Sequence, residues 1–98
     1  MELHLSEKDC RKIAVAIYSN QKEDSNDVYG RIVDYVEIDG LEFEIIFNKD
    51  VDMYYEECTN SWITKSANVR LHDVLFCGID VVYDQRYIED YAEQLLIN

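Results

Sequence analysis

Apolar residues recur at helical spacing near both ends of the chain. Between residues 10 and 17 they follow the i, i+3, i+4, i+7 pattern of a helix that buries one face. Ser6 is placed to cap this helix, and Asp9, three residues on, completes a capping box. The same apolar spacing returns over residues 88–95, after a second capping residue at Asp84. The pattern predicts one amphipathic helix at each end.

In the middle of the chain the spacing of apolar residues changes from the helical period to a period of two, which is typical of a strand. Asp39-Gly40 lies between two runs of β-branched and aromatic residues, 32–38 and 41–47. This dipeptide is the strongest short-range signal for a hairpin with a two-residue turn. Such a turn fixes the register, because it pairs Ile38 with Leu41 and every earlier residue with the corresponding later one.

The predicted register gives this hairpin two different faces. One is apolar except for Asp34, which is expected to lie beyond the helix cover, to pair with an arginine or to have a raised pKa. The other face sets Glu37 opposite Glu42, with Glu44 two residues further on. Like charges across a ladder are destabilising unless water screens them. We therefore expect the acidic face to be exposed.

The rest of the chain predicts more strands and one loop. Residues 51–58 are expected to form a third strand, and residues 59–68, which lack periodicity, a loop around Trp62. A second hairpin is predicted, with strands over residues 69–76 and 79–83.

The order helix, five strands, helix favours an α+β fold. Short turns between consecutive strands are typical of antiparallel sheets, and two amphipathic helices need an apolar face to cover. We predict a single domain over residues 1–98, with a four- or five-stranded, mainly antiparallel sheet and both helices on one face. Because an open sheet has edges and twofold pairing is the commonest way to cover one, we also expect a homodimer. Its contact should lie away from the acidic hairpin.

Charge narrows the range of partners. The formal net charge is −12, and residues 23–57 carry 12 acids against two bases. Such a field repels nucleic acid and anionic membranes and attracts basic proteins. The chain shows neither a membrane-spanning apolar run nor a signal-peptide pattern, and its three cysteines lack C-x-x-C spacing. We expect a cytoplasmic protein with buried, inert thiols.

Candidate catalytic and metal-binding residues are few. In the predicted second hairpin Asp73 and Asp80 lie diagonally on one face, about 7–8 Å apart, a separation that inverting glycosidases use. A small hydrolase that uses these two acids is therefore one alternative. A glycosidase also needs a deep cleft, however, and this chain is too short to form one. Residues 48–52 space oxygen ligands like a calcium loop but lack the glycine and glutamate that complete one. We expect no catalytic residue, metal or cofactor.

A binding surface is the leading expectation. Tyrosine and tryptophan beside basic residues resemble the composition of protein interfaces. The predicted aromatic and basic contacts are Tyr54, Tyr55, Trp62, Lys65 and Arg70. Trp62 is expected to be partly buried, closing the end of the sheet as the floor of this patch.

The acidic hairpin is the second predicted contact surface. Its glutamates, Glu37, Glu42 and Glu44, could attract a basic partner. An alternative is that these acids imitate the phosphates of nucleic acid and inhibit a DNA-binding protein.

The C-terminal half carries a family resemblance. Trp62-Ile63-Thr64, residues 69–74 and 78–81, and the closing helix resemble the C-terminal half of small acidic proteins from bacterial phages and mobile elements. The resemblance covers about the last 40 residues. It implies an accessory protein of a mobile element, a class of protein of which many members act on host proteins, and it brings no catalytic residues. The function expected from the sequence is therefore that of a non-enzymatic protein-interaction module.

Overall fold

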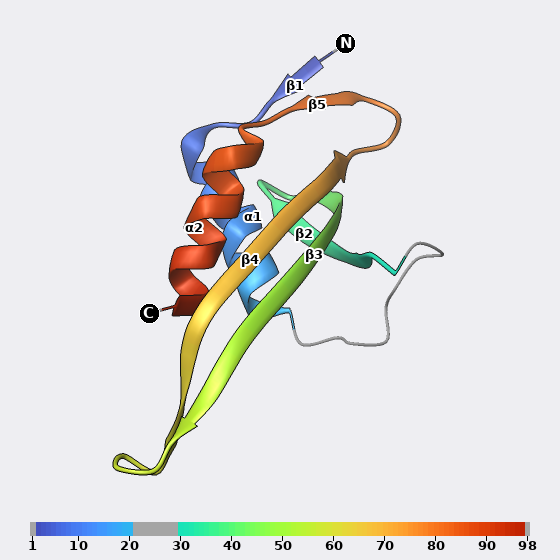
Figure 1. The fold of residues 1–98 in the computed structure, drawn as a ribbon. Coiled ribbons are helices and arrows are strands. Elements are labelled where there is room, and N and C mark those ends of the chain that lie inside the picture. Colours follow the sequence, from blue (N-terminus) through green and yellow to red (C-terminus); the bar gives the residue numbers. More distant parts are fainter. Residues whose placement is uncertain (1, 21–29, 98) are drawn as a thin grey trace.

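The computed structural model describes residues 2–20 and 30–97, which form an α+β fold (Figure 1). A three-stranded antiparallel sheet has the order β2-β3-β4, and β1 and β5 form a separate parallel pair. The elements in chain order are β1 (Glu2–His4), α1 (Glu7–Ser19), β2 (Ile32–Ile38), β3 (Leu41–Glu56), β4 (Ser61–Leu75), β5 (Asp80–Val82) and α2 (Gln85–Ile97).

Both helices begin where the sequence predicts. The Ser6 side chain accepts from the Asp9 amide at 3.2 Å, and the Asp9 carboxylate accepts from the Ser6 amide at 3.1 Å, so the capping box is complete. At the second helix the Asp84 carboxylate accepts from the Tyr87 amide at 3.1 Å. These side chains bind amide groups that the first turn of a helix leaves without partners.

The first hairpin also has its predicted register. Ile38 pairs with Leu41 and Ile32 with Phe47. Asp39 and Gly40 both have positive φ, 52° and 81°, as a tight two-residue hairpin turn requires. The predicted faces follow, because this register also sets Glu37 opposite Glu42 on the side away from the core.

The sequence predicts separate strands over residues 41–47 and 51–58, and this separation is wrong. β3 is one strand of 16 residues, and β4, with 15 residues, includes most of the predicted loop 59–68. Both strands continue far beyond the helices, where neither face is fully buried. The loop prediction failed because the alternation of polar and apolar residues weakens when a strand has water on both sides.

The second predicted hairpin forms only at its turn. Phe76 and Ile79 make an isolated antiparallel bridge, and the Ile79 amide donates to the Phe76 carbonyl at 2.7 Å. The chain then leaves the sheet, and β5 pairs in parallel with β1 instead of returning along β4. The main sheet therefore has three strands, not four or five.

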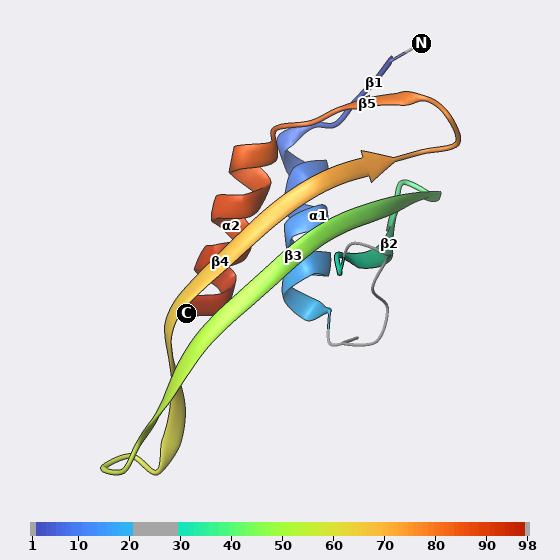
Figure 2. The same cartoon turned by 45° about the vertical axis from the view of Figure 1, so that its right-hand side comes forward.

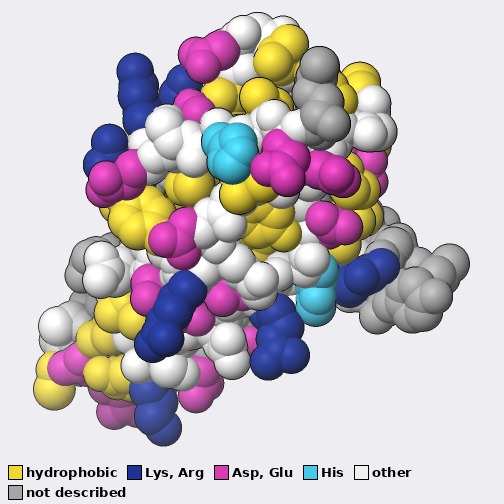
Figure 3. Space-filling view, turned by 90° about the horizontal axis from the view of Figure 1, so that it is seen from above, with side chains coloured by type: hydrophobic (Ala, Val, Ile, Leu, Met, Phe, Trp, Pro, Cys, Tyr) yellow, Lys and Arg dark blue, Asp and Glu magenta, His cyan; other side chains and the backbone are white. Residues whose placement is uncertain are grey.

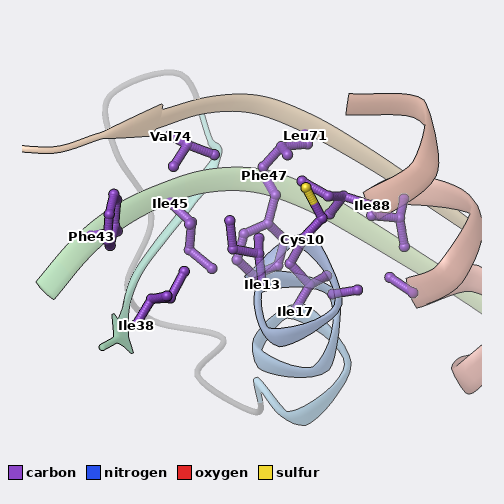
Figure 4. Packing of buried hydrophobic residues seen from close by; sticks show 13 residues of the cluster. Cys10, Ile13, Ile17, Ile38, Phe43, Ile45, Phe47, Leu71, Val74 and Ile88 are labelled. Carbon is purple, nitrogen blue, oxygen red and sulfur yellow. The ribbon is translucent and has the colours of Figure 1, made fainter. Parts of the chain in front are cut away.

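The core lies between one face of the sheet and the two helices (Figure 4). Apolar side chains of β3 and β4 meet the buried stripe of α1, while α2 contributes Ile88 and Ala92. The fully buried larger side chains are Phe43, Phe47, Ile13, Ile17, Ile45, Leu71, Ile88, Val74 and Cys10.

Helix α2 lies along the outer edge of β4 and binds its backbone. Glu89 accepts from the Leu71 amide and Glu93 from the Val69 amide, each at 2.7 Å. Four residues along a helix span about 6 Å, and two residues along a strand span about 6.6 Å. Because these repeats match, two glutamates one helical turn apart can occupy two successive outward amides. The edge of β4 is therefore closed by carboxylates at these two residues.

Lys49 of β3 caps the C-terminus of α1. Its Nζ donates to the carbonyls of Ile17, at 3.0 Å, and Asn20, at 2.5 Å. The last carbonyls of a helix otherwise lack partners, and a cation complements the negative end of the helix dipole. Burial lowers the pKa of Lys49. The Asn20 side chain donates to the Asp34 carboxylate at 2.5 Å, so this acid on the core-facing side of β2 has a hydrogen-bonded partner.

Candidate functional site: the projecting hairpin arm

The β3–β4 hairpin extends away from the helices as a two-stranded arm (Figures 1 and 2). We define the arm as residues 50–67. β2 pairs with β3 only as far as Phe47, whereas β4 accompanies β3 to its end, where Glu56 pairs with Ser61. The molecule measures 55 × 30 × 21 Å, and the arm accounts for its elongation.

Local chemistry shapes the arm and its tip. A register shift lies between Asp52 and Met53, where β4 has one extra residue, Lys65. Such a bulge increases the twist of a ribbon. At the tip, Asn60 adopts a positive φ of 55°, and the Tyr55 hydroxyl donates to its side chain.

One face of the arm is aromatic and exposed. Tyr55 lies opposite Trp62, and their rings meet edge to face with centroids 5.6 Å apart. Trp62 is 65% exposed and Tyr55 45% exposed. Side chains alternate between faces along a strand. Val51, Met53 and Tyr55 therefore continue the face that carries Phe47 in the core, but here neither α1 nor α2 covers it.

An exposed apolar face of this kind is unusual on the surface of a folded protein. A two-stranded ribbon is marginally stable alone, and large apolar side chains grouped on a surface often mark an interaction site. The remaining exposed apolar members of the arm are Val51, Met53 and Tyr54.

The structure brings only part of the predicted patch together. Tyr55 and Trp62 share one face, whereas Tyr54 points to the opposite face and pairs with Ile63. Lys65 is exposed at the bulge. The expected partial burial of Trp62 is wrong, because its segment belongs to a strand beyond the sheet body rather than to a loop across its end.

Arg70 lies apart from the aromatic pair. It pairs with Asn48 on the sheet face away from the helices and lines a polar hollow of about 250 Å³ together with Asp50 and Asn68. His72 is hydrogen-bonded to the Asn48 side chain at 2.6 Å. Arg70 therefore belongs to a separate polar region at the base of the arm.

The predicted acidic surface lies at the other end of the sheet. Glu42 and Glu44 follow each other along β3, with Glu37 opposite the first. The row is interrupted there, because the next positions on this face are Ile46 and Asn48, and acids return only at Asp50 and Asp52. Seen from the end occupied by β1 and β5, acidic side chains are interspersed with apolar and neutral ones rather than gathered in one strip (Figure 3).

The structure removes the geometric basis for pairing Asp73 with Asp80. Their predicted proximity required β5 to return along β4, but Asp80 pairs with Glu2 of β1. The Asp73 carboxylate accepts from the neighbouring Val74 amide at 2.9 Å. These two acids are therefore not set opposite each other by a shared ladder.

Residues 48–52 lie within β3 and do not form a metal-binding loop. An extended strand directs successive ligands along a line instead of around an ion. Across residues 2–20 and 30–97 there is no cluster of three or more histidine, cysteine or acidic side chains able to hold a metal.

The three cysteines differ in environment. Cys10 is buried in the core, as expected, but Cys58 and Cys77 are exposed, which corrects the prediction that all three are buried. Burial raises the pKa of the Cys10 thiol. A hydrogen bond with the Asp84 backbone lowers the pKa by less, and the charges of Asp84 and Asp9 raise it further. Cys10 is thus a protonated core side chain rather than an activated nucleophile.

Alkaline pH is expected to destabilise the protein through Cys10. A raised folded pKa means that the stabilisation is fully present below the ordinary thiol pKa of 9.0 and is lost as the pH rises through the folded pKa. Lys49 acts with the opposite sign, since its folded pKa is lowered from 10.5, and stability rises with pH through that window. A variant is therefore needed to isolate the thiol.

Cys10→Ala should be about 1 kcal/mol less stable than wild type at neutral pH, from lost burial. It should lose less stability than wild type as the pH rises above 9.0. The ordinary tyrosine pKa of 10.0 means that Tyr83 also contributes to the pH dependence near that pH, equally in both proteins. Urea unfolding at a series of pH values measures both. Parallel pH dependences in the two proteins would contradict the assignment.

Several residues that build the arm and its surroundings were missed from sequence. Val51 and Met53 belong to the predicted third strand, but the predicted binding patch does not include them. The alternation of acid and apolar residues over 50–53 was the available signal. Glu89 and Glu93 carried no such signal, because their i, i+4 spacing is equally typical of a solvated helix face.

Comparison of the chain with protein-family models, curated proteins and solved structures gives no match. Neither α1 nor α2, the helices within the described residues, is long and apolar enough to cross a membrane.

Proposed function

We propose that this protein is a non-enzymatic interaction module that binds another protein through the projecting arm. The observation that carries the proposal is the exposed Tyr55–Trp62 pair on an apolar face that neither α1 nor α2 covers. Tyrosine and tryptophan are enriched among the residues that dominate binding energy at protein interfaces. The arm presents them on a hairpin anchored in the body of the sheet.

The other candidate functions have less support. A nucleic-acid mimic needs extended rows of carboxylates, and the row on β3 is interrupted after Glu44 by Ile46 and Asn48. A hydrolase using Asp73 and Asp80 needs the two carboxyl groups to converge, and the β1–β5 pairing draws Asp80 away from β4. An accessory role in a mobile element agrees with a binding module and rests on the resemblance of the C-terminal half.

Replacing Trp62 should separate folding from binding. Because the ring is 65% exposed and contacts Tyr55 beyond the core, Trp62→Ala is expected to change the free energy of unfolding by about 0.5 kcal/mol or less. Denaturant unfolding measures this change. A loss of several kcal/mol would show that the indole supports the core, contrary to the proposal.

The same variant tests the contact surface. Immobilised wild-type protein, Trp62→Ala and Tyr35→Ala are compared for the proteins that they retain from the source cell. Tyr35, 57% exposed on β2, is a matched aromatic control outside the arm. A central aromatic anchor contributes about 2 kcal/mol or more, which is more than tenfold in affinity. The proposal expects a protein lost with Trp62→Ala and kept with Tyr35→Ala, and identical retention by all three would refute it.

A further inference from the structure

We propose that the outer edge of β3 in the arm accepts an extended, basic and apolar strand from the partner protein, which would take the place beside β3 that β2 leaves at Phe47. This inference rests on the proposed function and adds the partner's conformation and chemistry. It is carried by the backbone of the arm, separately from the aromatic pair.

The direction of the β3 backbone follows from the contacts of β4. The amides of Val69 and Leu71 donate to glutamates of α2 and therefore point away from β3. In an antiparallel ladder, two residues directly opposite each other either both point inward or both point outward. Lys49, opposite Val69, thus directs its backbone groups toward the β2 side, away from β4.

Backbone groups of successive residues in a strand point alternately to its two edges, so the direction found at Lys49 can be followed into the arm. The extra residue at the bulge belongs to β4, so β3 continues without interruption. The backbone N–H and C=O groups of Val51, Met53 and Tyr55 consequently point to the outer edge. No segment within residues 2–20 and 30–97 pairs with β3 there. The side chains of these same three residues form the apolar face. One incoming strand would therefore contact both the outward backbone groups and the apolar side chains.

In the body of the sheet, in contrast, several outward edge amides have carboxylate acceptors. Glu89 and Glu93 bind two amides of β4, and Asp73 binds that of Val74. On β2 the Asp34 carboxylate accepts from the Tyr35 amide at 2.8 Å. Such carboxylates hinder pairing with another strand. Within the described residues no side chain has this role for the amides of Val51, Met53 and Tyr55.

The β4 side of the arm is a poorer template. Its bulge interrupts the regular spacing of outward backbone groups, and the extra residue is the exposed Lys65. Bulges and edge lysines both discourage strand pairing. The β3 edge has neither feature between Val51 and Tyr55.

Charge selects the chemistry of the added strand. Asp50 and Asp52 are exposed on the face opposite Val51 and Met53. A strand beside β3 would set alternate side chains next to these aspartates and next to the apolar face. Opposite charges across neighbouring strands are stabilising, so a segment that alternates apolar and basic residues fits best.

A second copy of the chain fits this edge less well. In antiparallel twofold pairing centred on Met53, Asp50 of one copy would face Glu56 of the other. Centring on Tyr54 places Asp52 opposite Glu56, and centring on Asp52 places that residue opposite itself. Like charges meet in each register, which is destabilising, and both copies carry a net charge of −12.

Amide hydrogen exchange followed by NMR can test strand addition. The probe is a short synthetic peptide alternating valine and lysine, compared with one alternating valine and glutamate at about 150 mM salt, where long-range charge effects are screened. The lysine peptide should slow exchange of the Val51, Met53 and Tyr55 amides, and the glutamate peptide should not. The amides of Asp52 and Tyr54 serve as internal controls, because they already face β4.

A proline variant distinguishes backbone pairing from side-chain contact. Val51→Pro removes an amide that points to the outer edge and leaves the ladder to β4 intact, as edge strands tolerate. It should weaken peptide binding by about tenfold or more through the lost main-chain bond. Val51→Ala, which keeps the amide, should have a smaller effect. Unchanged shifts of core amides verify that each variant is folded.

The outcomes separate this inference from the proposed function. If Trp62→Ala abolishes capture of the cellular partner but the lysine peptide protects no edge amide, strand addition is wrong and the interaction module stands. Equal binding of both peptides, or binding unaffected by Val51→Pro, also overturns the inference. Edge amides already protected in concentrated, dimeric protein would identify a second copy as the occupant and would likewise overturn it.

Discussion

The double variant Glu89→Ala, Glu93→Ala is expected to lose about 3–6 kcal/mol of stability, because a hydrogen bond to a charged group contributes about 1.5–3 kcal/mol. Each glutamate binds one β4 amide at 2.7 Å, and the residues that carry these amides, Val69 and Leu71, are buried. Without the carboxylates the amides lose their acceptors inside the α2–β4 contact. The free energy of unfolding of a small domain is only about 5–15 kcal/mol in total, so this loss would be a large part of it.

Two further variants make this test specific. Asp90→Ala removes an exposed acid of the same helix, which forms only a 3.9 Å ion pair with Arg86, and should cost about 0.5 kcal/mol or less. The double glutamine variant of Glu89 and Glu93 keeps neutral acceptors and should lose about half as much as the alanine variant. Denaturant unfolding of all three supplies the values. Equal losses for Asp90→Ala and the double alanine variant would mean that the carboxylates do not support the sheet edge.

Phe47→Ala should cost about 3–5 kcal/mol, the range for deleting a large buried aromatic side chain. Phe47 is completely buried and pairs with Ile32 on one side and Leu71 on the other, so it lies at the junction of all three strands. The surrounding side chains come from both the sheet and α1 (Figure 4). Because they are held by separate elements, they cannot easily collapse into the cavity.

Tyr35→Ala is the matched control for Phe47→Ala. Tyr35 is an aromatic residue of the same sheet, but it is 57% exposed on the opposite face. Its removal should change the free energy of unfolding by about 0.5 kcal/mol or less. Urea unfolding compares the two variants with wild type. A difference of less than about 1 kcal/mol between them would contradict the assignment of the core face.

The elements predicted correctly are those specified by neighbouring residues. The α1 capping box needs only Ser6 and Asp9, and the first hairpin needs only Asp39-Gly40 between two alternating runs. Once that turn is set, the period of two assigns every side chain from Ile32 to Phe47 to a face. The apolar spacing, the capping hydrogen bonds and the steric requirements of the turn each involve only a few neighbouring residues. They can therefore be recognised from the sequence alone.

The candidate site was predicted only in part. Tyr55 and Trp62 were recognised as interface residues from their chemistry, but their meeting depends on a ladder between β3 and β4 that runs through a bulge. Arg70 was grouped with them because it is near in sequence. In the folded chain, side chains alternate between the two faces of the twisted ribbon, and Arg70 lies on the face opposite the aromatic pair.

The remaining features depend on contacts between residues distant in sequence. Lys49 lies 32 residues from Ile17, whose carbonyl it binds, and Glu93 lies 24 residues from Val69. A lysine or glutamate has the same local signal whether it is solvated or bound to backbone, so only the packing of α1 and α2 against the sheet assigns these roles. The arm is exposed for the same reason: its apolar face resembles a core face in sequence, and the helices end before they can cover it.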